Sequence, residues 1–91
     1  MMGRRIYPNE NGELIFSPGD YGFDLKSGRW LARCPDPGCH TGDLSLHEVV
    51  EHEDKTITVS PSILTNPLGE YHDPSSKTWH GFLERGIWRT A

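Results

Sequence analysis

The sequence lacks a long run of apolar residues, and only 34% of its 91 residues are hydrophobic. No stretch approaches the roughly 20 apolar residues that a membrane-spanning helix needs. The opening segment, MMGRRIYPNENGELIF, holds two arginines but no apolar run as long as the core of a signal peptide. The sequence therefore predicts a soluble, cytoplasmic protein with no membrane segment.

Basic residues and cysteines are also few. Nine lysines and arginines stand against thirteen aspartates and glutamates, which gives a net charge of −4. Broad binding of duplex nucleic acid needs a basic face that neutralises phosphates, so nucleic acid is an unlikely partner. In a reducing cytoplasm the two cysteines are more often thiols or metal ligands than a disulfide, although Cys34 and Cys39 are close enough in sequence to bridge.

A helical pattern is missing as well. No apolar pattern of helical period runs for more than about two turns, and ten glycines and seven prolines interrupt the chain. The sequence predicts an all-β fold: one small domain over residues 1–91, built as consecutive short hairpins of about five to seven strands with at most one short helix. A core this small needs support from a disulfide, a metal or a second subunit, so a homodimer is one option.

Alternating apolar residues place the expected hairpins. Residues 21–32 form the first hairpin, with its turn at 26–28, and residues 43–63 form the second, with its turn at EDK. In the second hairpin, the capping box of Ser45 and Glu48 leaves a short helix over 46–51 as the alternative for the first arm.

The remaining segments are a further strand candidate, two closing strands and two loops. ELIF at 13–16 is a short strand candidate that ends in the turn SPGD. WHGFLE and IWRT are the closing strands, folded back at Arg85 and Gly86. Residues 65–78 have the composition of a long loop, and residues 1–12 are expected to be loosely ordered.

The strongest chemical signal in the sequence is for zinc. Cys34 and Cys39 flank a Pro/Gly-rich turn at the spacing of paired zinc ligands. Only histidines can complete the site, and His72 and His80 are the better pair, because His40 adjoins Cys39 and the two would have difficulty pointing at one ion. A single CxxxxC falls far short of the double CxxC pattern of a zinc ribbon, so ordinary packing of both cysteines is the alternative. The candidate Zn²⁺ ligands are therefore Cys34, Cys39, His72 and His80.

His80 has two further interpretations. A histidine between aromatic residues is most often a hydrogen-bonded structural residue. Alternatively, it lines a binding pocket whose candidate residues are Ser60, Ser62, His80 and Glu84. The two serines flank a proline without the GxSxG elbow of a hydrolase, so no catalytic set is assigned.

A second histidine cluster is present in the segment HEVVEHED. His47 and His52 flank its EVVE portion, and such a group could hold a divalent ion. The carboxylates of this segment are more simply read as a solvated acidic surface.

Three motifs resemble those of a known family. GFDLKSGRWLARCP followed by GC, then HEDKTITVSPSIL, then WHGFLERGIW look like an uncharacterised family of small bacteriophage and prophage proteins, over roughly residues 20–90. Some members are labelled ammonia monooxygenase, a membrane enzyme that a chain without a membrane segment does not resemble. The resemblance points to Cys34, Cys39 and His80; relatives often carry a cysteine shortly before the last histidine, where this chain has SSKTWH.

Two functions are compatible with these features. The first is a phage-type binding protein, zinc-stapled, that acts in the host cytoplasm by binding a host or phage protein and so modulates host machinery or host defence. The second is a small-molecule-binding or hydrolytic module with a pocket around His80, covered by residues 65–78 and completed by a second subunit. The absence of a catalytic set favours the first.

Overall fold

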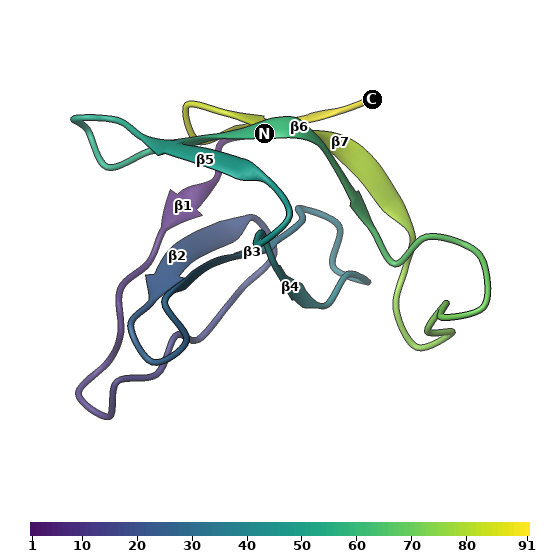
Figure 1. The fold of residues 1–91 in the computed structure, drawn as a ribbon, viewed down its shortest axis with the longest axis horizontal. Coiled ribbons are helices and arrows are strands. Elements are labelled where there is room, and N and C mark those ends of the chain that lie inside the picture. Colours follow the sequence, from purple (N-terminus) through teal and green to yellow (C-terminus); the bar gives the residue numbers. More distant parts are fainter.

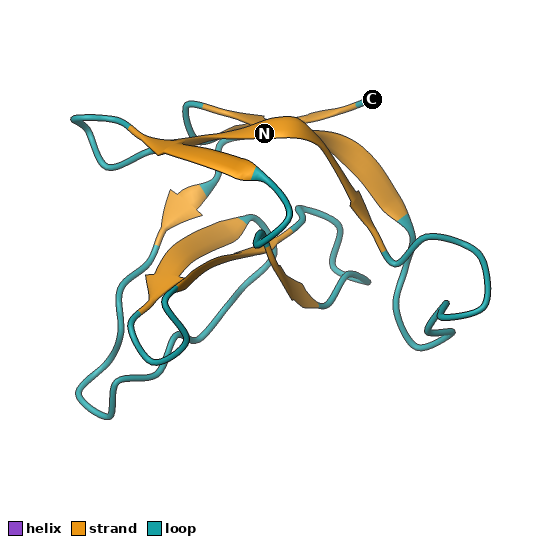
Figure 2. Ribbon diagram, viewed as in Figure 1, coloured by secondary structure: helices purple, strands orange, loops and turns teal.

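A computed structural model describes all residues, 1–91, as eight strands and no helix (Figures 1 and 2). The strands form two four-stranded sheets, in the orders β1-β2-β3-β4 and β5-β6-β7-β8. The all-β prediction is confirmed, with eight strands where five to seven were expected. Because the chain has no helix, it has none that could cross a membrane. The strands are β1 (Arg4–Arg5), β2 (Asp20–Asp24), β3 (Arg29–Arg33), β4 (Thr41–Asp43), β5 (Glu48–Glu51), β6 (Ile57–Thr65), β7 (Trp79–Glu84) and β8 (Ile87–Thr90).

The first sheet is built around the expected hairpin of β2 and β3. Tyr21 pairs with Ala32, and Phe23 pairs with Trp30, so the apolar residues of both arms lie on one face. The connecting turn ends at Gly28, whose φ of 71° is the left-handed conformation that glycine adopts without steric cost. This hairpin is confirmed.

The second sheet contains the other two expected hairpins, with one correction. β5 pairs with β6 and β7 with β8, and the last turn lies at Arg85 and Gly86 as predicted. The helix alternative over 46–51 is wrong, because Val49 pairs with Val59 and packs against the core. Tertiary packing therefore outweighs the capping-box signal.

The start of the second hairpin also differs from the prediction. The ascending arm begins at Glu48, not at Asp43. Residues 41–43 instead form β4, which pairs with β3 and extends the first sheet. The hydroxyl of Ser45 donates to the Asp43 carboxylate over 2.7 Å and shapes the turn between the two sheets.

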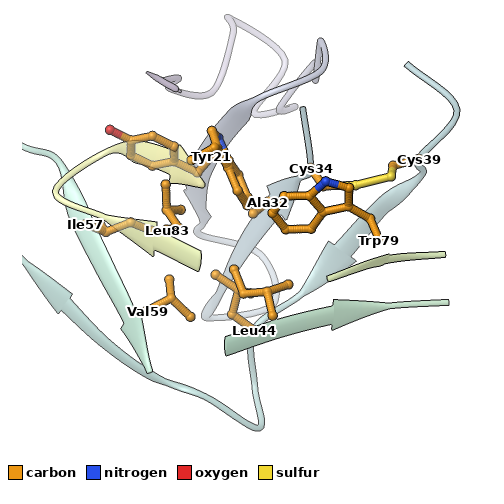
Figure 3. Packing of buried hydrophobic residues seen from close by; sticks show 11 residues of the cluster. Tyr21, Ala32, Cys34, Cys39, Leu44, Ile57, Val59, Trp79 and Leu83 are labelled. Atoms are coloured by element: carbon orange, nitrogen blue, oxygen red, sulfur yellow. A yellow bond between two sulfur atoms is a disulfide. The ribbon is translucent and has the colours of Figure 1, made fainter. Parts of the chain in front are cut away.

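The core lies between the inner faces of the two sheets (Figure 3). Tyr21 and Ala32 contribute from the first sheet, and Ile57 and Leu83, both with no exposed surface, contribute from the second. In β7 the burial alternates strictly, so that Trp79, Gly81 and Leu83 face inward while His80 and Glu84 face solvent. Of the two faces that the sequence left open, the tryptophan face is therefore the buried one.

The N-terminal segment differs from the strand expected at 13–16. Residues 13–16 form no strand, because no strand pairs with them, and Ile15 is 67% exposed. Within residues 1–12, β1 runs parallel to β2, and the Ile6 amide donates to the Tyr21 carbonyl over 2.8 Å. Gly22 permits this covering, because a Cβ there would lie 2.8 Å from the Ile6 carbonyl oxygen.

Arg33 ties three separate loop positions together. Its guanidinium donates to the backbone carbonyls of Cys39 at 2.8 Å, Pro37 at 3.0 Å and Phe16 at 3.2 Å. A planar fork of donors can reach three carbonyls at once, whereas the single ammonium of a lysine cannot.

Arg33→Lys is therefore expected to lower the free energy of unfolding by about 1–3 kcal/mol, the cost of leaving partly buried carbonyls unpaired. Urea denaturation followed by fluorescence measures this loss. Arg29→Lys is the matched control, since Arg29 makes one exposed ion pair with Asp43, and such pairs contribute about 0–1 kcal/mol. Equal stability of the two variants would contradict the role given to Arg33.

Candidate functional site

The four candidate zinc ligands are not brought together. Cys34 and Cys39 are joined by a disulfide and are almost completely buried. His72 lies with its Nδ1 3.3 Å from the Asn66 carbonyl oxygen, and the exposed His80 lies on the outer face of β7. No group of three or more histidine, cysteine, aspartate or glutamate side chains forms a metal-binding cluster. The spacing of Cys34 and Cys39 permits a disulfide. The prediction of free thiols rests only on the expected reducing compartment.

The four candidate pocket residues lie on an open sheet face. His80 Nε2 and Ser62 Oγ are 2.9 Å apart, and Glu84 accepts a hydrogen bond from Arg89 at 2.6 Å. Ser60 is exposed on the neighbouring strand. None of the four lines any of the three main concavities of the molecule, so the sequence grouped residues that share a sheet face but lie outside these concavities.

His47 and His52 form no ion site either. His47 Nε2 is 3.1 Å from the Ser62 carbonyl oxygen and so carries the proton as its donor. The Nδ1 atom of His47 is buried and has no hydrogen-bond partner. His52 Nε2 instead bonds to Thr58 Oγ1 over 2.7 Å. Both histidines therefore act first as links within the second sheet.

The concavity with the most apolar lining is a cleft of about 290 Å³ between the two sheets. We call it the inter-sheet cleft. One wall is β4, and the other is the end of β6 together with the loop that follows it. Apolar side chains from both sheets form its floor. These are Ala32, Leu44, Ile63 and Trp88.

The charge of the inter-sheet cleft is negative. Asp43 and Asp73 line it, and no lysine or arginine does. Arg29, which lies outside the lining, pairs with Asp43 at 3.1 Å, so Asp73 is the carboxylate of the cleft without a lysine or arginine partner. Hydrogen bonds from the Ser45 hydroxyl and amide hold the pKa of Asp43 below its usual value. The Ser75 hydroxyl and amide do the same for the pKa of Asp73. Both carboxylates are therefore ionised at neutral pH.

Gly42 keeps the cleft open. It pairs with Ala32 across β3 and β4, so a side chain at position 42 would point to the same side as the buried Ala32. A Cβ built on Gly42 would meet no atom within 4 Å, and its φ is not in the left-handed range. Neither packing within the chain nor backbone conformation requires glycine there.

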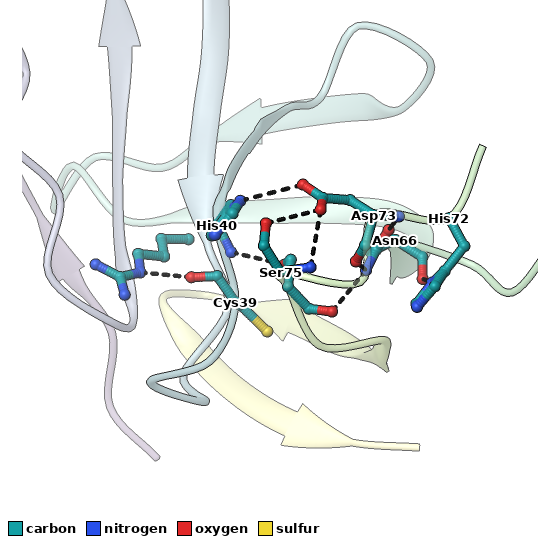
Figure 4. A network of polar contacts seen from close by, with 8 residues as sticks. Cys39, His40, Asn66, His72, Asp73 and Ser75 are labelled. Carbon is teal, nitrogen blue, oxygen red and sulfur yellow. Dashed lines mark hydrogen bonds and ion pairs between the residues drawn. The ribbon is translucent and has the colours of Figure 1, made fainter.

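The loop over residues 66–78 closes one end of the cleft and is ordered by Asn66 (Figure 4). The Asn66 side-chain amide donates to the carbonyls of Asp73 and Ser76, each at 2.8 Å, and its carbonyl accepts from the Asp73 amide at 2.8 Å. The loop is also tied to the disulfide turn, since the Lys77 amide donates to the Gly38 carbonyl at 3.0 Å. The long loop was predicted, but its internal order was not.

Replacing Asn66 by alanine is expected to release this loop. Limited proteolysis with trypsin should then cut after Lys77 about tenfold faster or more, because local opening exposes the backbone to the protease. Asn66→Gly is the control: Asn66 has a φ of 48°, which glycine tolerates. If both variants are cleaved rapidly, the hydrogen bonds of the Asn66 side chain hold the loop. If the glycine variant resists cleavage, the backbone conformation at position 66 holds it.

His40 and Asp73 meet at the rim of the cleft. His40 Nδ1 lies 3.8 Å from the Asp73 carboxylate, and both side chains are more than half exposed. The His40 amide donates to Ser76 Oγ at 3.2 Å, which links β4 to the loop. Sequence reasoning missed this pairing, because His40 and Asp73 lie far apart in the chain and neither belongs to a motif.

Comparison with known proteins gives no relative: no family model matches the chain, and neither a curated protein nor a solved structure is similar to it.

Proposed function

We propose that this chain is a small binding protein, that its partner is another protein, and that the partner occupies the inter-sheet cleft. Gly42 carries this proposal. Glycine weakens a strand and commonly marks a place where another backbone approaches closely. Here no part of the chain itself makes that approach, so the space at Gly42 is available to a second molecule.

The size and charge of the cleft favour a protein segment over a small molecule. At about 290 Å³ the cleft lies just below the range of roughly 300–1,000 Å³ in which drug-sized ligands and cofactors bind. It suits one apolar side chain in the floor, with a cationic group near Asp73.

The biological setting that we propose follows the family resemblance. The SPSI and WHGF motifs suggest a phage-type protein whose partner is a host or phage protein. Binding would then modulate host machinery or host defence. The setting rests on the sequence motifs, and the binding role rests on the cleft.

The proposal is tested with displayed random linear peptides selected on the immobilised full chain. Calorimetry then measures the affinity of the selected peptides for the wild type and for Gly42→Trp. A Cβ at position 42 meets no atom within 4 Å, so the indole is expected to extend into the cleft and to lower peptide affinity about tenfold or more while the melting temperature is kept. Leu25→Trp, on the 75% exposed turn residue between β2 and β3, is the matched control and should bind as the wild type does. Peptides that bind both variants equally would overturn the proposal.

The second candidate function, hydrolysis, rests on one observation. His80 Nε2 and Ser62 Oγ are 2.9 Å apart, the distance of a nucleophile and its base. Glu84 pairs with Arg89 and does not orient His80. A p-nitrophenyl acetate assay tests this candidate: turnover that Ser62→Ala abolishes would support it, and equal rates for the wild type and Ser62→Ala would exclude it.

A further inference from the structure

The wall of the inter-sheet cleft formed by β4 is an unpaired strand edge. β4 is the last strand of its sheet, and all three of its residues are exposed. The Leu44 amide donates to the Trp30 carbonyl at 2.9 Å. In the antiparallel register of these strands, Ala32 and Gly42 are then the next hydrogen-bonded pair, because such pairs occur at every second residue.

This alternation leaves two residues of β4 with free backbone groups. Thr41 and Asp43 lie between the hydrogen-bonded pairs, so their N–H and C=O groups point away from β3. No turn or loop hydrogen bond uses the backbone of either residue. The edge of β8 differs, because the Trp88 amide there already donates to the Met1 carbonyl over 2.7 Å.

The opposite wall of the cleft, at the end of β6, also has unpaired backbone groups. The pairing of β5 with β6 ends at Glu48 and Ser60, so the end of β6 has a neighbouring strand only on the β7 side. The His80 carbonyl accepts a hydrogen bond from the Ala91 amide, so the backbone groups of His80 point toward β8. His80 and its cross-strand partner Leu64 therefore share no backbone hydrogen bond. Leu64 therefore also directs its backbone groups toward the side on which the cleft lies.

We infer that an extended segment of the partner protein adds to β4 as a fifth strand of the first sheet, with an apolar side chain on the cleft floor and a lysine or arginine beside Asp73. Strand addition uses main-chain hydrogen bonds for affinity and side-chain pockets for specificity. The Asp73 carboxylate, which lines the cleft and has no lysine or arginine partner, complements the basic side chain. This inference rests on the proposed function, because it describes how the cleft would hold its partner.

Hydrogen exchange of single amides, measured by NMR with and without a saturating selected peptide, tests the inference. The Thr41 and Asp43 amides should exchange at least about tenfold more slowly in the complex. The Gly42 amide is already bonded to β3, so its exchange rate should change little. Thr41→Pro removes one edge donor where proline is tolerated and should weaken binding about threefold to tenfold. Thr90→Pro, at the outer edge of β8, is the matched control and should not weaken it.

The outcomes separate this inference from the proposed function. If Gly42→Trp weakens peptide binding but the Thr41 and Asp43 amides are not protected in the complex, the cleft remains the binding site and strand addition is overturned. Selected peptides that lack a basic residue would overturn the charge assignment. The same amides could be protected without peptide, with a protection that rises with protein concentration and a dimer in sedimentation equilibrium. That result would make a second copy of this chain the occupant and would overturn a separate partner.

Discussion

Replacing Trp88 by alanine is expected to bring the domain close to unfolding. Trp88 is 2% exposed and packs edge-to-face on Trp79, with ring centres 5.4 Å apart. Removing such a side chain costs about 3–5 kcal/mol through lost burial and the cavity left behind. A domain of this size has a total stability of about 5–14 kcal/mol, so the loss is a large part of it. Chemical denaturation of the variant measures the change.

Trp88→Phe separates packing from hydrogen bonding. The indole Nε1 donates to the Gly19 carbonyl at 2.9 Å, and that carbonyl also accepts the Arg4 amide at 3.1 Å. Because one donor remains, the lost hydrogen bond itself should cost only about 1 kcal/mol. A phenylalanine variant as unstable as the alanine variant would contradict packing as the main contribution of Trp88.

Breaking the disulfide between Cys34 and Cys39 is expected to have the second largest effect. The bond closes a short loop, with a sequence separation of 5, for which the chain-entropy estimate is about 2 kcal/mol. Reductant, or the Cys34→Ser/Cys39→Ser double variant, should therefore lower the melting temperature by several degrees. The loop over residues 66–78 should also exchange faster, since Lys77 is bonded to the turn that the disulfide closes.

A chelator provides the contrast with a zinc-stapled domain. With the two sulfur atoms bonded to each other, a chelator should leave the melting temperature unchanged while reductant lowers it. A chelator that lowers the melting temperature, with no response to reductant, would contradict the disulfide and restore the zinc hypothesis built on Cys34 and Cys39.

The parts of the fold that local patterns determine could be predicted from the sequence. Alternating apolar residues and turn glycines gave the hairpin of β2 and β3 and the closing hairpin of β7 and β8. The short strands β1 and β4 were missed, because Arg4–Arg5 and Thr41–Asp43 carry no apolar alternation and pair only through their backbones. ELIF at 13–16 shows the reverse error: its residues suit a strand, but no partner strand is present.

The candidate site was harder to predict for the same reason. The sequence grouped His80 with Ser60, Ser62 and Glu84, and these residues do share a region of one sheet, but only the packing of two sheets creates a cavity. Gly42 was the available signal, as a glycine between the polar residues Thr41 and Asp43. The meeting of His40 with Asp73 depends on the folded path of the long loop, which no local pattern specifies.

The most direct test of the cleft as the binding site is a map of ¹⁵N chemical-shift changes when a selected peptide is titrated into the full chain. We expect the largest changes at Gly42 and at Thr65 and Asn66 on the opposite wall, with little change at His80 and Phe82 on the outer face of β7. The reverse distribution, with changes centred on His80 and Phe82 and none at Gly42, would contradict binding in the inter-sheet cleft.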